Sequence, residues 1–457
     1  MKKKKTLISI LLLFLLVSGF GCKGLSSEEQ QAIKPVRLNY WTVYNDLGML
    51  RKFADEYQRQ RPYVRINIRK VREEEFDDLF VNALADDVSP DIISINSRDI
   101  NKYRSRITTV PDSVTVANVS VSDSYTKETV VTTETTNMIT PRALKSNFVS
   151  VVYDDVVQDD QIYGLPLALD TMALYYNKGL LDSVGIPVAP ENWEDFMESI
   201  KESARFDSDG NITQAGVALG TGKNISRSFD ILSLLMIQSG VKMSQGSAIT
   251  FASGLSSNNE NHPTLSAMRF YTDFARPTKE IYTWNEDMPD ALESFVSNKS
   301  VFYFGFAYDY PIIKARAPQM ELEVVPVPQL SPNEPKNIAN YFVESVVKKS
   351  KNQDEAWDFI RFMTTPEKIA EYTTGARRPT PLRTQIEEQS QDIILQPFVS
   401  NILQAENWYH GSDKESAEDA FDQMIGEYLG PYSGTKSDTQ RKIEIIQYGA
   451  SRVQQSY

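Results

Sequence analysis

The most constraining feature of the sequence is that segments with the apolar spacing of a β-strand alternate regularly with segments that have the apolar spacing of an α-helix. Apolar side chains alternate with polar ones over residues 36–40, and then recur at i, i+3, i+4 and i+7 over residues 50–57. The same exchange repeats over residues 64–68 and 76–83 and ends in an apolar run at residues 92–95. This order of strand, helix, strand, helix and strand predicts an α/β fold with a parallel sheet and right-handed crossovers.

Ligands of parallel α/β sheets bind beyond the carboxyl ends of the strands. The polar and aromatic side chains that follow the first and third predicted strands should therefore share one rim of the sheet. These side chains are Trp41, Tyr44, Asn45, Asp46, Asn96, Ser97 and Asp99.

Length and charge exclude several classes of protein. The 457 residues are enough for two to three domains or lobes. The formal charge of -13 argues against non-specific binding to nucleic acid or anionic lipid, since both depend on basic patches. With one Cys, and His262 and His410 as the only imidazoles, the chain has no internal disulfide and no thiolate metal cage. We expect no metal site and no cofactor.

The amino terminus has the layout of an export signal. Lys2–Lys5 precede an apolar run from Leu7 to Val17, which is too short for a membrane-spanning helix of about 20 residues. Cys22 follows Ser18–Gly21 and resembles the lipidated cysteine of bacterial lipoproteins, although Gly19 and Phe20 fit that motif imperfectly. Cleavage before Cys22 would remove four Lys, leaving 44 basic against 61 acidic residues and a formal charge of -17. We expect a signal peptide over residues 1–21 and a lipidated tether over residues 22–34.

Residues 108–140 are rich in Thr, Ser and Val and contain few large apolar side chains. The alternation of Val114, Val116 and Val119 is compatible with a β-hairpin, and a surface excursion is an equally good interpretation. We assign no chemistry to this stretch.

Several segments then resemble one known family. The run IYGLPLALDTMALYYNKGLLDSVGIPVAPENWEDF, from Ile162 to Phe196, is similar to the central signature of family 1 extracellular solute-binding proteins. These are the maltose-binding-protein-like receptors of ATP-driven importers. Four further segments resemble that family in the same order, namely LNYWTVYND, PDIISIN, LESFVSNKSVFYFGF and AWDFIRFMTTPEKIAEY. The resemblance implies two α/β lobes of the type II periplasmic-binding-protein fold that close around a ligand by hinge rotation.

Three extended segments fit the crossings between such lobes. They contain Gly164 and Pro166, residues 324–328, and residues 375–381. On this basis we expect lobe one to combine residues 35–166 and 329–376, and lobe two to combine residues 167–328 and 377–457.

Sugar binding needs aromatic faces for pyranose C–H surfaces and planar polar groups for paired hydroxyls. The resemblance places such groups on the lobe-one rim given above and at several positions of lobe two. The lobe-two candidates are Asp170, Phe306, Tyr308, Trp408 and Tyr409, and further candidates are Trp284, Tyr341, Arg377 and Arg378. The platform position that the family often fills with Trp is Phe or Tyr here.

Each candidate also has a structural interpretation. Trp41 could be a buried strand residue, and Phe306, Tyr308 and Trp408 could be ordinary core aromatics. Asn45 or Asp46 could cap the following helix. Asp170 could be a hinge hydrogen-bonding group, and Arg377 and Arg378 could pair with nearby carboxylates.

Two further motifs fail. Asp207, Asp209 and Asn211 match the start of a calcium loop, but Ile212 and Ala218 occupy the positions of its essential Gly and Glu. Gly220, Gly222 and Lys223 lack the spacing of a phosphate loop, so any ATPase would be a separate subunit.

We therefore expect a monomeric, lipid-anchored receptor that delivers a carbohydrate to a membrane permease, in a periplasm or at the cell surface, without catalysing a reaction. One alternative is a secreted glycosidase, which needs only two suitably spaced carboxylates. Another is the same fold with a polyamine, a peptide or an organic anion as its ligand.

Overall fold

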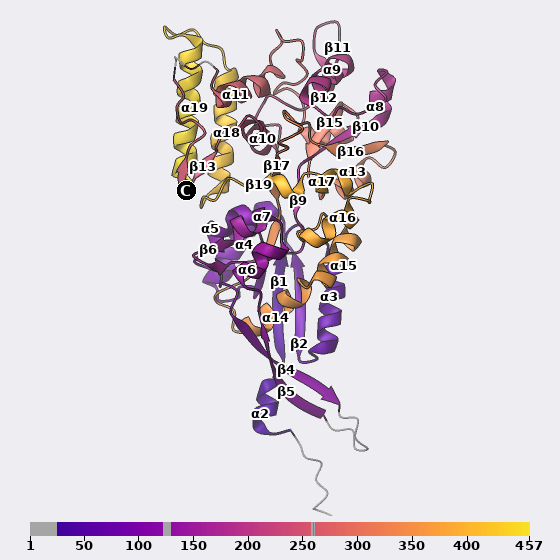
Figure 1. Cartoon of the computed structure of the whole chain (residues 1–457), viewed down its shortest axis with the longest axis vertical. Coiled ribbons are helices and arrows are strands. Elements are labelled where there is room, and N and C mark those ends of the chain that lie inside the picture. The colour runs from indigo at the N-terminus through magenta and orange to yellow at the C-terminus, as the bar shows by residue number, and fades with distance from the viewer. Residues whose placement is uncertain (1–24, 122–128, 257–258, 260) are drawn as a thin grey trace, which may run out of the picture.

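The computed structural model describes residues 25–121, 129–256, 259 and 261–457. The predicted signal segment and Cys22 lie outside these residues. The described chain forms two α/β lobes stacked along the long axis of the molecule (Figure 1), as the type II two-lobe fold predicts. Within the described part of the chain, every helix is too short or too polar to cross a lipid bilayer.

Lobe one is built on a five-stranded sheet with the order β2-β1-β3-β18-β8. β1 (Val36–Thr42) pairs in parallel with both β2 (Val64–Lys70) and β3 (Ile92–Asn96), which confirms the parallel arrangement predicted from periodicity. β18 (Phe342–Val346) enters antiparallel between β3 and β8 (Leu165–Pro166). A strand from late in the chain therefore completes the first sheet.

The two predicted helices of this region are present. α3 (Leu47–Gln60) buries Leu50, Phe53, Ala54 and Tyr57, the four residues of the predicted apolar stripe. It begins at the cap residue Asp46, whose side chain accepts a hydrogen bond from the Met49 amide, and it ends before Arg61-Pro62. α4 (Glu73–Ala85) covers the sheet with Phe76, Phe80 and Ala83.

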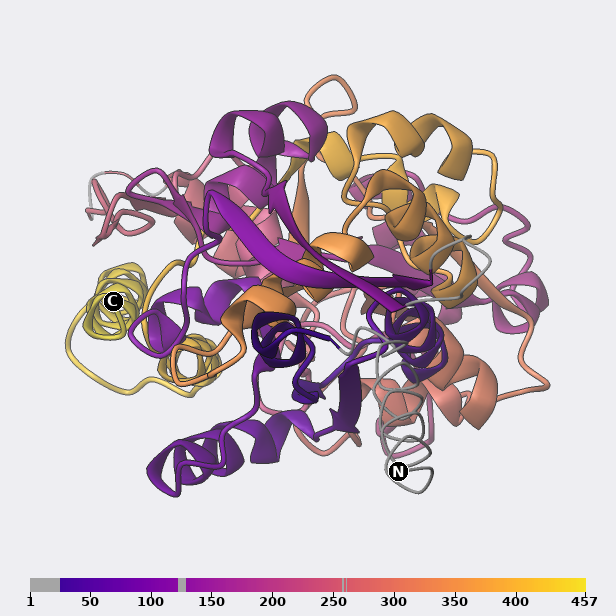
Figure 2. The ribbon, with the colours of Figure 1, turned by 90° about the horizontal axis from the view of Figure 1, so that it is seen from below.

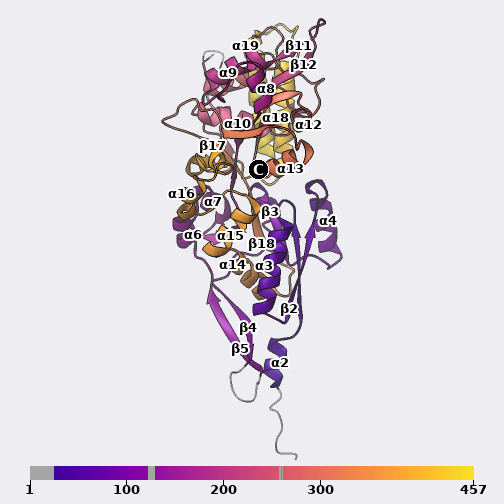
Figure 3. The ribbon, with the colours of Figure 1, turned by 90° about the vertical axis from the view of Figure 1, so that its right-hand side faces the viewer.

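The Thr-rich stretch forms a long antiparallel hairpin of β4 (Ser113–Val121) and β5 (Thr129–Asn137). The hairpin extends from the end of lobe one that is farthest from lobe two (Figures 1 and 3). From below it lies across that end of the molecule (Figure 2), and β4 packs against α14 (Gln353–Met363). The short helix α2 (Ser27–Ala32), within the predicted tether, packs beside β5.

Lobe two contains a second five-stranded sheet with the order β11-β12-β15-β10-β16. Its central strands β15 (Ser300–Gly305) and β10 (Ala173–Asn177) are fully buried and pair antiparallel. The flanking strands are β16 (Leu322–Pro326), β12 (Ile212–Val217) and β11 (Arg205–Phe206). Its main helices are α8 (Lys178–Ser183), α9 (Trp193–Ser203), α10 (Ser228–Gln238), α11 (Pro263–Asp273), α12 (Ala291–Val296), α13 (Asp309–Arg316), α18 (Lys414–Leu429) and α19 (Asp438–Gln455).

A small third sheet lies where the chain passes between the lobes (Figure 1). Its strands have the order β19-β17-β9, with bounds Ala405–Glu406, Asn337–Asn340 and Asp170–Thr171. The remaining α-helices near this sheet and in lobe one are α5 (Ile100–Tyr103), α6 (Pro141–Asn147), α7 (Ser150–Val156), α15 (Pro366–Ala376), α16 (Ile386–Gln389) and α17 (Gln396–Val399).

The buried side chains form two separate hydrophobic cores. One core contains buried residues between Leu38 and Leu169, between Ala339 and Leu382, and in the segment 399–405. The other contains buried residues between Met172 and Ile338, Phe398, and residues from Trp408 to Val453. Tyr44 packs against both cores, which marks its loop as a point of contact between the lobes.

Candidate functional site

The two lobes touch through aromatic rings. Tyr44, in the loop after β1, lies with its ring centroid 4.9 Å from that of Tyr308, which follows β15 of lobe two. The ring of Phe342, at the start of β18, lies 5.0 Å from Tyr44 on the lobe-one side. The strand ends thus bring three aromatic rings together at the junction of the lobes, as rims of α/β sheets do for ligand-binding side chains.

Two arginines lie against the lobe-two rings. Phe306 stacks on Tyr308 with a centroid distance of 5.6 Å and an interplanar angle of 22°. The guanidinium of Arg227, at the start of α10, lies 5.3 Å from each of these two rings. The guanidinium of Arg378, just after α15, lies 5.4 Å from the Tyr308 ring. Cation–π contacts of this kind fix the orientation of the rings.

Each arginine has a buried carboxylate close by. Arg378 donates two hydrogen bonds to Asp170, at 3.1 and 2.6 Å, and so anchors the first crossing strand. Asp309 lies 3.8 Å from Arg227 and accepts a hydrogen bond of 3.0 Å from the Phe306 amide. Burial raises the pKa of the Asp309 carboxyl. Nε of Arg227 is buried and has no hydrogen-bond partner among the described residues.

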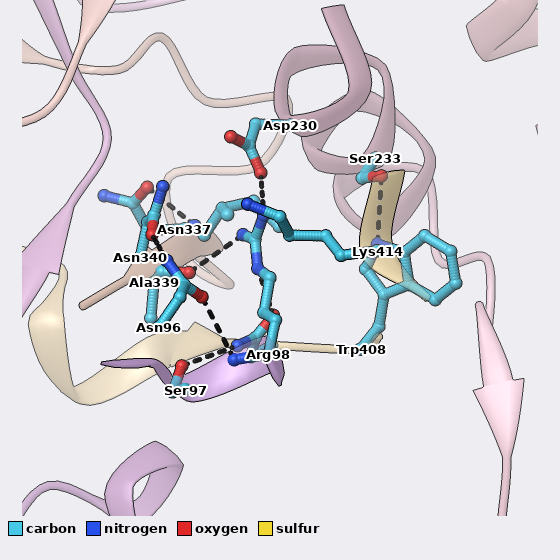
Figure 4. Close-up of polar contacts among 12 residues, drawn as sticks. Asn96, Ser97, Arg98, Asp230, Ser233, Asn337, Ala339, Asn340, Trp408 and Lys414 are labelled. Carbon is cyan, nitrogen blue, oxygen red and sulfur yellow. Dashed lines mark hydrogen bonds and ion pairs between the residues drawn. The ribbon is translucent and has the colours of Figure 1, made fainter. Parts of the chain in front are cut away.

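Amide side chains connect the aromatic contact to the crossing strands. Asn96, at the end of β3, donates a hydrogen bond of 2.7 Å to the side chain of Asn340 in β17 (Figure 4). Nδ2 of Asn340 in turn lies 3.4 Å from the hydroxyl of Tyr308. Planar amides beside aromatic faces are suited to recognise ligands that carry hydroxyl groups.

A buried ion pair joins the lobes next to these amides. Arg98, two residues after β3, lies 2.7 Å from Asp230 of α10 and donates to the Ala339 carbonyl at 3.0 Å (Figure 4). It also donates to Asn407 at 2.8 Å. Asn407 also donates a hydrogen bond of 3.2 Å to the hydroxyl of Ser97. The guanidinium of Arg98 is thus directed at lobe two and at the crossing strands, and Arg98, Asp230 and Asn407 are all buried.

A small cavity lies at the junction, lined in part by Phe342 and Asn96. It encloses about 40 Å³, which is far less than the roughly 300–1,000 Å³ of small-molecule sites. Its lining comes mostly from lobe one, with the start of α18 contributed by lobe two. The lining residues are Val43, Glu73, Phe76, Asp77, Ser94, Ile95, Asn96, Asp99, Lys102, Tyr103, Phe342, Lys414 and Glu415.

Charged groups line this cavity. The Tyr44 hydroxyl donates to Glu73 at 2.7 Å, and Lys414 of α18 lies 3.5 Å from the same carboxylate. Lys102 of lobe one lies 3.9 Å from Glu415. Burial raises the pKa of Asp99. The Lys414–Glu73 and Lys102–Glu415 contacts thus join the two lobes at this cavity.

The structure brings six of the sequence-predicted residues into this junction. They are Tyr44, Asn96, Asp170, Phe306, Tyr308 and Arg378. Ser97 and Asp99 lie in the same loop after β3. Asn45 points into lobe one, where its amide group lies 2.7 Å from Glu344, and Asp46 caps α3.

The other predicted residues lie elsewhere. Trp41 is buried on β1 beneath Arg69, and Tyr341 donates to Asp155 at 2.8 Å. Trp284 and Tyr409 are buried in the lobe-two core, as is Trp408, whose indole donates to Ser233 (Figure 4). Arg377 is exposed and ends α15 with a φ of 51°.

Sequence reasoning missed several residues of the junction. Arg98, Asp309 and Phe342 each adjoin a predicted residue in the chain, so a wider window around the motifs would have included them. Arg227 has no local signal, because its partners Phe306 and Tyr308 are remote in sequence. Among residues 25–121, 129–256, 259 and 261–457, no group of three or more His, Cys, Asp or Glu side chains is arranged to hold a metal ion.

Comparison with known proteins identifies a family model and individual sequences that are similar to this chain. A family model described as bacterial extracellular solute-binding protein matches residues 87–395. The multiple sugar-binding protein of Streptococcus mutans is 21% identical over 353 residues, which cover 74% of this chain and 82% of that protein. The galactooligosaccharide-binding protein of Bacillus subtilis is 28% identical over a shorter segment, covering 21% of this chain and 22% of that protein.

Solved structures share the fold over nearly the whole chain. The cyclic α-maltosyl-1,6-maltose binding protein from Arthrobacter globiformis superposes with a TM-score of 0.68 at 15% identity, covering 93% of this chain and 100% of that one. An ABC transporter solute-binding protein from Thermotoga lettingae, bound with α-D-tagatose, gives a TM-score of 0.65 at 16% identity, covering 92% and 99%. At these identities the similarity establishes the two-lobe fold.

Proposed function

This chain belongs to the bacterial extracellular solute-binding proteins, and we propose that it captures a carbohydrate, in particular an oligosaccharide, between its two lobes. The observation that carries the proposal is the contact of Tyr44 with Tyr308 across the junction. When the lobes separate, two aromatic faces become available on opposite walls of one cleft. A pyranose ring that enters between them would bury its C–H surfaces against both walls.

The polar groups around these rings support a ligand with hydroxyl groups. Asn96 and Asn340 present amides, which donate and accept hydrogen bonds at once. The buried Nε–H of Arg227 has no hydrogen-bond partner among the described residues. A hydroxyl or ring oxygen of a ligand could accept a hydrogen bond from it. The names of the relatives and neighbours, which include sugar-binding proteins and a tagatose complex, support the same ligand class.

The balance of charges favours a neutral ligand over a polyamine or an organic anion. Arg378 is matched by Asp170 and Arg227 is accompanied by Asp309, so the rings are surrounded by equal numbers of opposite charges. A cationic or anionic ligand would leave one buried charge without compensation, which is costly in a site closed to water.

We propose that the protein delivers its ligand through movement of the two lobes relative to each other. The two cores would move as rigid bodies, with the chain crossing between them after residue 166, between residues 329 and 341, and between residues 377 and 408. The closed form would present a monomer to permease subunits of an ATP-driven importer. Lipidation at Cys22, after removal of residues 1–21, would hold it at the outer face of the cytoplasmic membrane. No chemical step is part of this function.

The test is thermal unfolding of the exported chain carrying Cys22→Ser, with a panel of oligosaccharides, monosaccharides, polyamines and amino acids. A ligand at 100 times its Kd should stabilise the protein by about 2.7 kcal/mol and raise Tm measurably. A saturable rise with one glycan class, absent in Tyr308→Ala, is the expected result. A rise with polyamines or amino acids alone would overturn the ligand class, and glycan cleavage seen by chromatography would instead favour the glycosidase alternative.

The anchor is tested separately by cell fractionation. The exported protein should sediment with membranes when Cys22 is present and be released when Cys22 is replaced by Ser. Equal release of both forms would contradict lipidation without touching the proposed ligand.

A further inference from the structure

Glu344 is a carboxylate fully buried in the lobe-one sheet, in the middle of β18. It accepts hydrogen bonds from the Tyr40 hydroxyl at 2.5 Å, from Nδ2 of Asn45 at 2.7 Å and from the Ser94 hydroxyl at 3.1 Å. No Lys, Arg or His of the described residues pairs with it. A buried carboxylate without a cation costs free energy, so its presence in a core strand calls for a role beyond packing.

The hydrogen bonds of Glu344 lead directly to the loop that carries Tyr44. Asn45 is held from both ends of its amide: Nδ2 donates to Glu344, and Oδ1 accepts from the Tyr372 hydroxyl of α15 at 3.1 Å. The same Tyr372 hydroxyl accepts from the Asp46 amide at 3.1 Å. The backbone on the carboxyl side of Tyr44 is therefore fixed by a network that begins at Glu344.

β18 also supports the Tyr44 side chain itself. Phe342 precedes Glu344 by two residues, so both project from the same face of the strand. The ring of Phe342 lies against the ring of Tyr44, while Glu344 holds the neighbouring Asn45. One strand thus determines both where the loop backbone runs and where its aromatic ring lies.

We propose that Glu344 is a positioning residue for ligand capture: it holds residues 43–46 so that Tyr44 faces Tyr308, and its ionisation makes the order of this loop, and hence ligand affinity, depend on pH. The link to affinity rests on the proposed function, whereas the link to loop order does not. The ordered loop buries the Glu344 carboxyl and so favours its protonated form, whereas an opened loop lets water solvate the charge, so ionisation weakens the hold on residues 43–46.

The surroundings of Glu344 support titration near neutral pH. Burial raises the pKa of Glu344 to about 7, and the hydrogen bonds from Tyr40, Asn45 and Ser94 only partly oppose this. The titratable groups that face the network are Tyr40 and Tyr372, whose pKa values are both raised by burial, so both remain neutral over this range. Asp46 and Arg378 act on Tyr372 from α3 and from the segment after α15.

The test is hydrogen exchange of the ligand-free chain between pH 6 and pH 8, corrected for the intrinsic rate. The Asp46 amide is the reporter, because it donates to Tyr372. Its protection should fall with pH in the wild-type chain, because ionisation of the buried carboxyl favours the opened loop. Glu344→Gln keeps an acceptor but cannot ionise, and its protection should be the same at both values. Wild-type protection that is unchanged or rises, or a fall retained in Glu344→Gln, would overturn the proposal.

Glu418 of α18 provides a matched control. Burial raises its pKa to about 7 as well, but none of its hydrogen bonds or ion pairs among the described residues reaches residues 43–46. Glu418→Gln should therefore retain the pH dependence of the Asp46 amide, and its loss in this variant would contradict the assignment to Glu344.

Maltotetraose, mannobiose and tagatose then serve as probes of affinity. If one of them binds, its Kd should rise severalfold from pH 6 to pH 8 in the wild type and stay constant in Glu344→Gln. A pH-independent Kd with pH-dependent exchange would overturn the link to affinity. Failure of every glycan in the panel would count against the proposed function, while the exchange result still decides the positioning role.

Discussion

Tyr44 of lobe one and Tyr308 of lobe two lie with their ring centroids 4.9 Å apart, at an interplanar angle of 32°. Each ring thus covers the face of the other ring that could contact a ligand. Since aromatic pairs contribute about 0.5–1.5 kcal/mol beyond their buried area, this contact favours closure even without a ligand.

Replacing Tyr44 with Ala should weaken both closure and capture. We expect a larger radius of gyration for the ligand-free chain in small-angle scattering, and at least about tenfold weaker binding of the glycan identified in the panel, because one wall of the cleft loses its aromatic face. Phe206→Ala is the control: it removes a stacked ring from the surface pair with Tyr282 and should change neither quantity. Equal affinities of Tyr44→Ala and the wild type would contradict a ligand position beside Tyr44.

Replacing Asp230 with Asn should destabilise the chain strongly. The change leaves Arg98 buried without its carboxylate, and loss of one partner of a buried pair costs about 3–5 kcal/mol. Chemical denaturation measures the effect, and Arg98→Met combined with Asp230→Leu should recover much of the loss. Lys349→Ala, which breaks the exposed pair with Asp87, should cost less than about 1 kcal/mol. A similarly small cost for Asp230→Asn would show that the Arg98 pair is exposed to water.

The pair of His410 and Asp155 should make stability depend on pH. Nε2 of His410 lies 3.0 Å from Asp155 of α7; burial alone would lower the His410 pKa, but the hydrogen bond and charge of Asp155 raise it overall. Because the folded pKa exceeds the unfolded value of about 6.5, the stabilisation is fully present below pH 6.5 and is lost as pH rises through the folded pKa.

Denaturation at pH 5.5 and pH 8.5 checks this sign. His410→Asn should lose more stability, relative to the wild type, at the lower pH. In an Asp155→Asn background the same replacement should show no such difference. A larger loss at high pH would mean that His410 is held in its neutral form.

Gly305→Ala should damage the loop that carries Phe306 and Tyr308. A Cβ at Gly305 would lie 2.6 Å from the Tyr303 ring and 2.7 Å from Oδ2 of Asp309, the atom that holds the Phe306 amide. We expect a loss of about 1–3 kcal/mol in unfolding free energy, as for overpacked cores, together with weaker glycan binding.

Gly426→Ala is the matched control for that change. Gly426 lies inside α18 with open space where a Cβ would be, so Ala should raise stability by about 0.5–1 kcal/mol and leave binding unchanged. Calorimetry of both variants gives the comparison. Similar stability of the two variants would show that the Tyr303 and Asp309 side chains can move away from the added Cβ at little cost in free energy.

The helices and strands of lobe one could be predicted where the spacing of apolar residues along the chain determines them. The stripe Leu50, Phe53, Ala54 and Tyr57 is buried as its spacing indicates, and β1 runs parallel to β2 and β3. The position of β18 could not be read in the same way. Its five buried residues identify a core strand. Which strands it pairs with, and in which direction, depends on segments hundreds of residues away.

The same limit applies to the site. Tyr44 and Tyr308 follow strand ends and were accessible to motif reasoning, whereas their contact depends on the closure of the lobes. Arg227 stands at the start of a helix without any local pattern that points to Tyr308. Glu344 did carry a signal, because a charged residue inside the apolar run YFVESVV needs buried partners.

The late entry of β18 also has a consequence for biosynthesis. Ser94 and Glu344, which share a hydrogen bond in the first sheet, are 250 residues apart. A nascent chain that has emerged only to residue 300 lacks the strand that joins β3 to β8, so its first half cannot complete a native sheet. Such non-local topology slows folding, because loop closure must precede the contacts that reward it. Translation can therefore finish before lobe one becomes stable, which keeps the chain in a state that a secretion channel can thread.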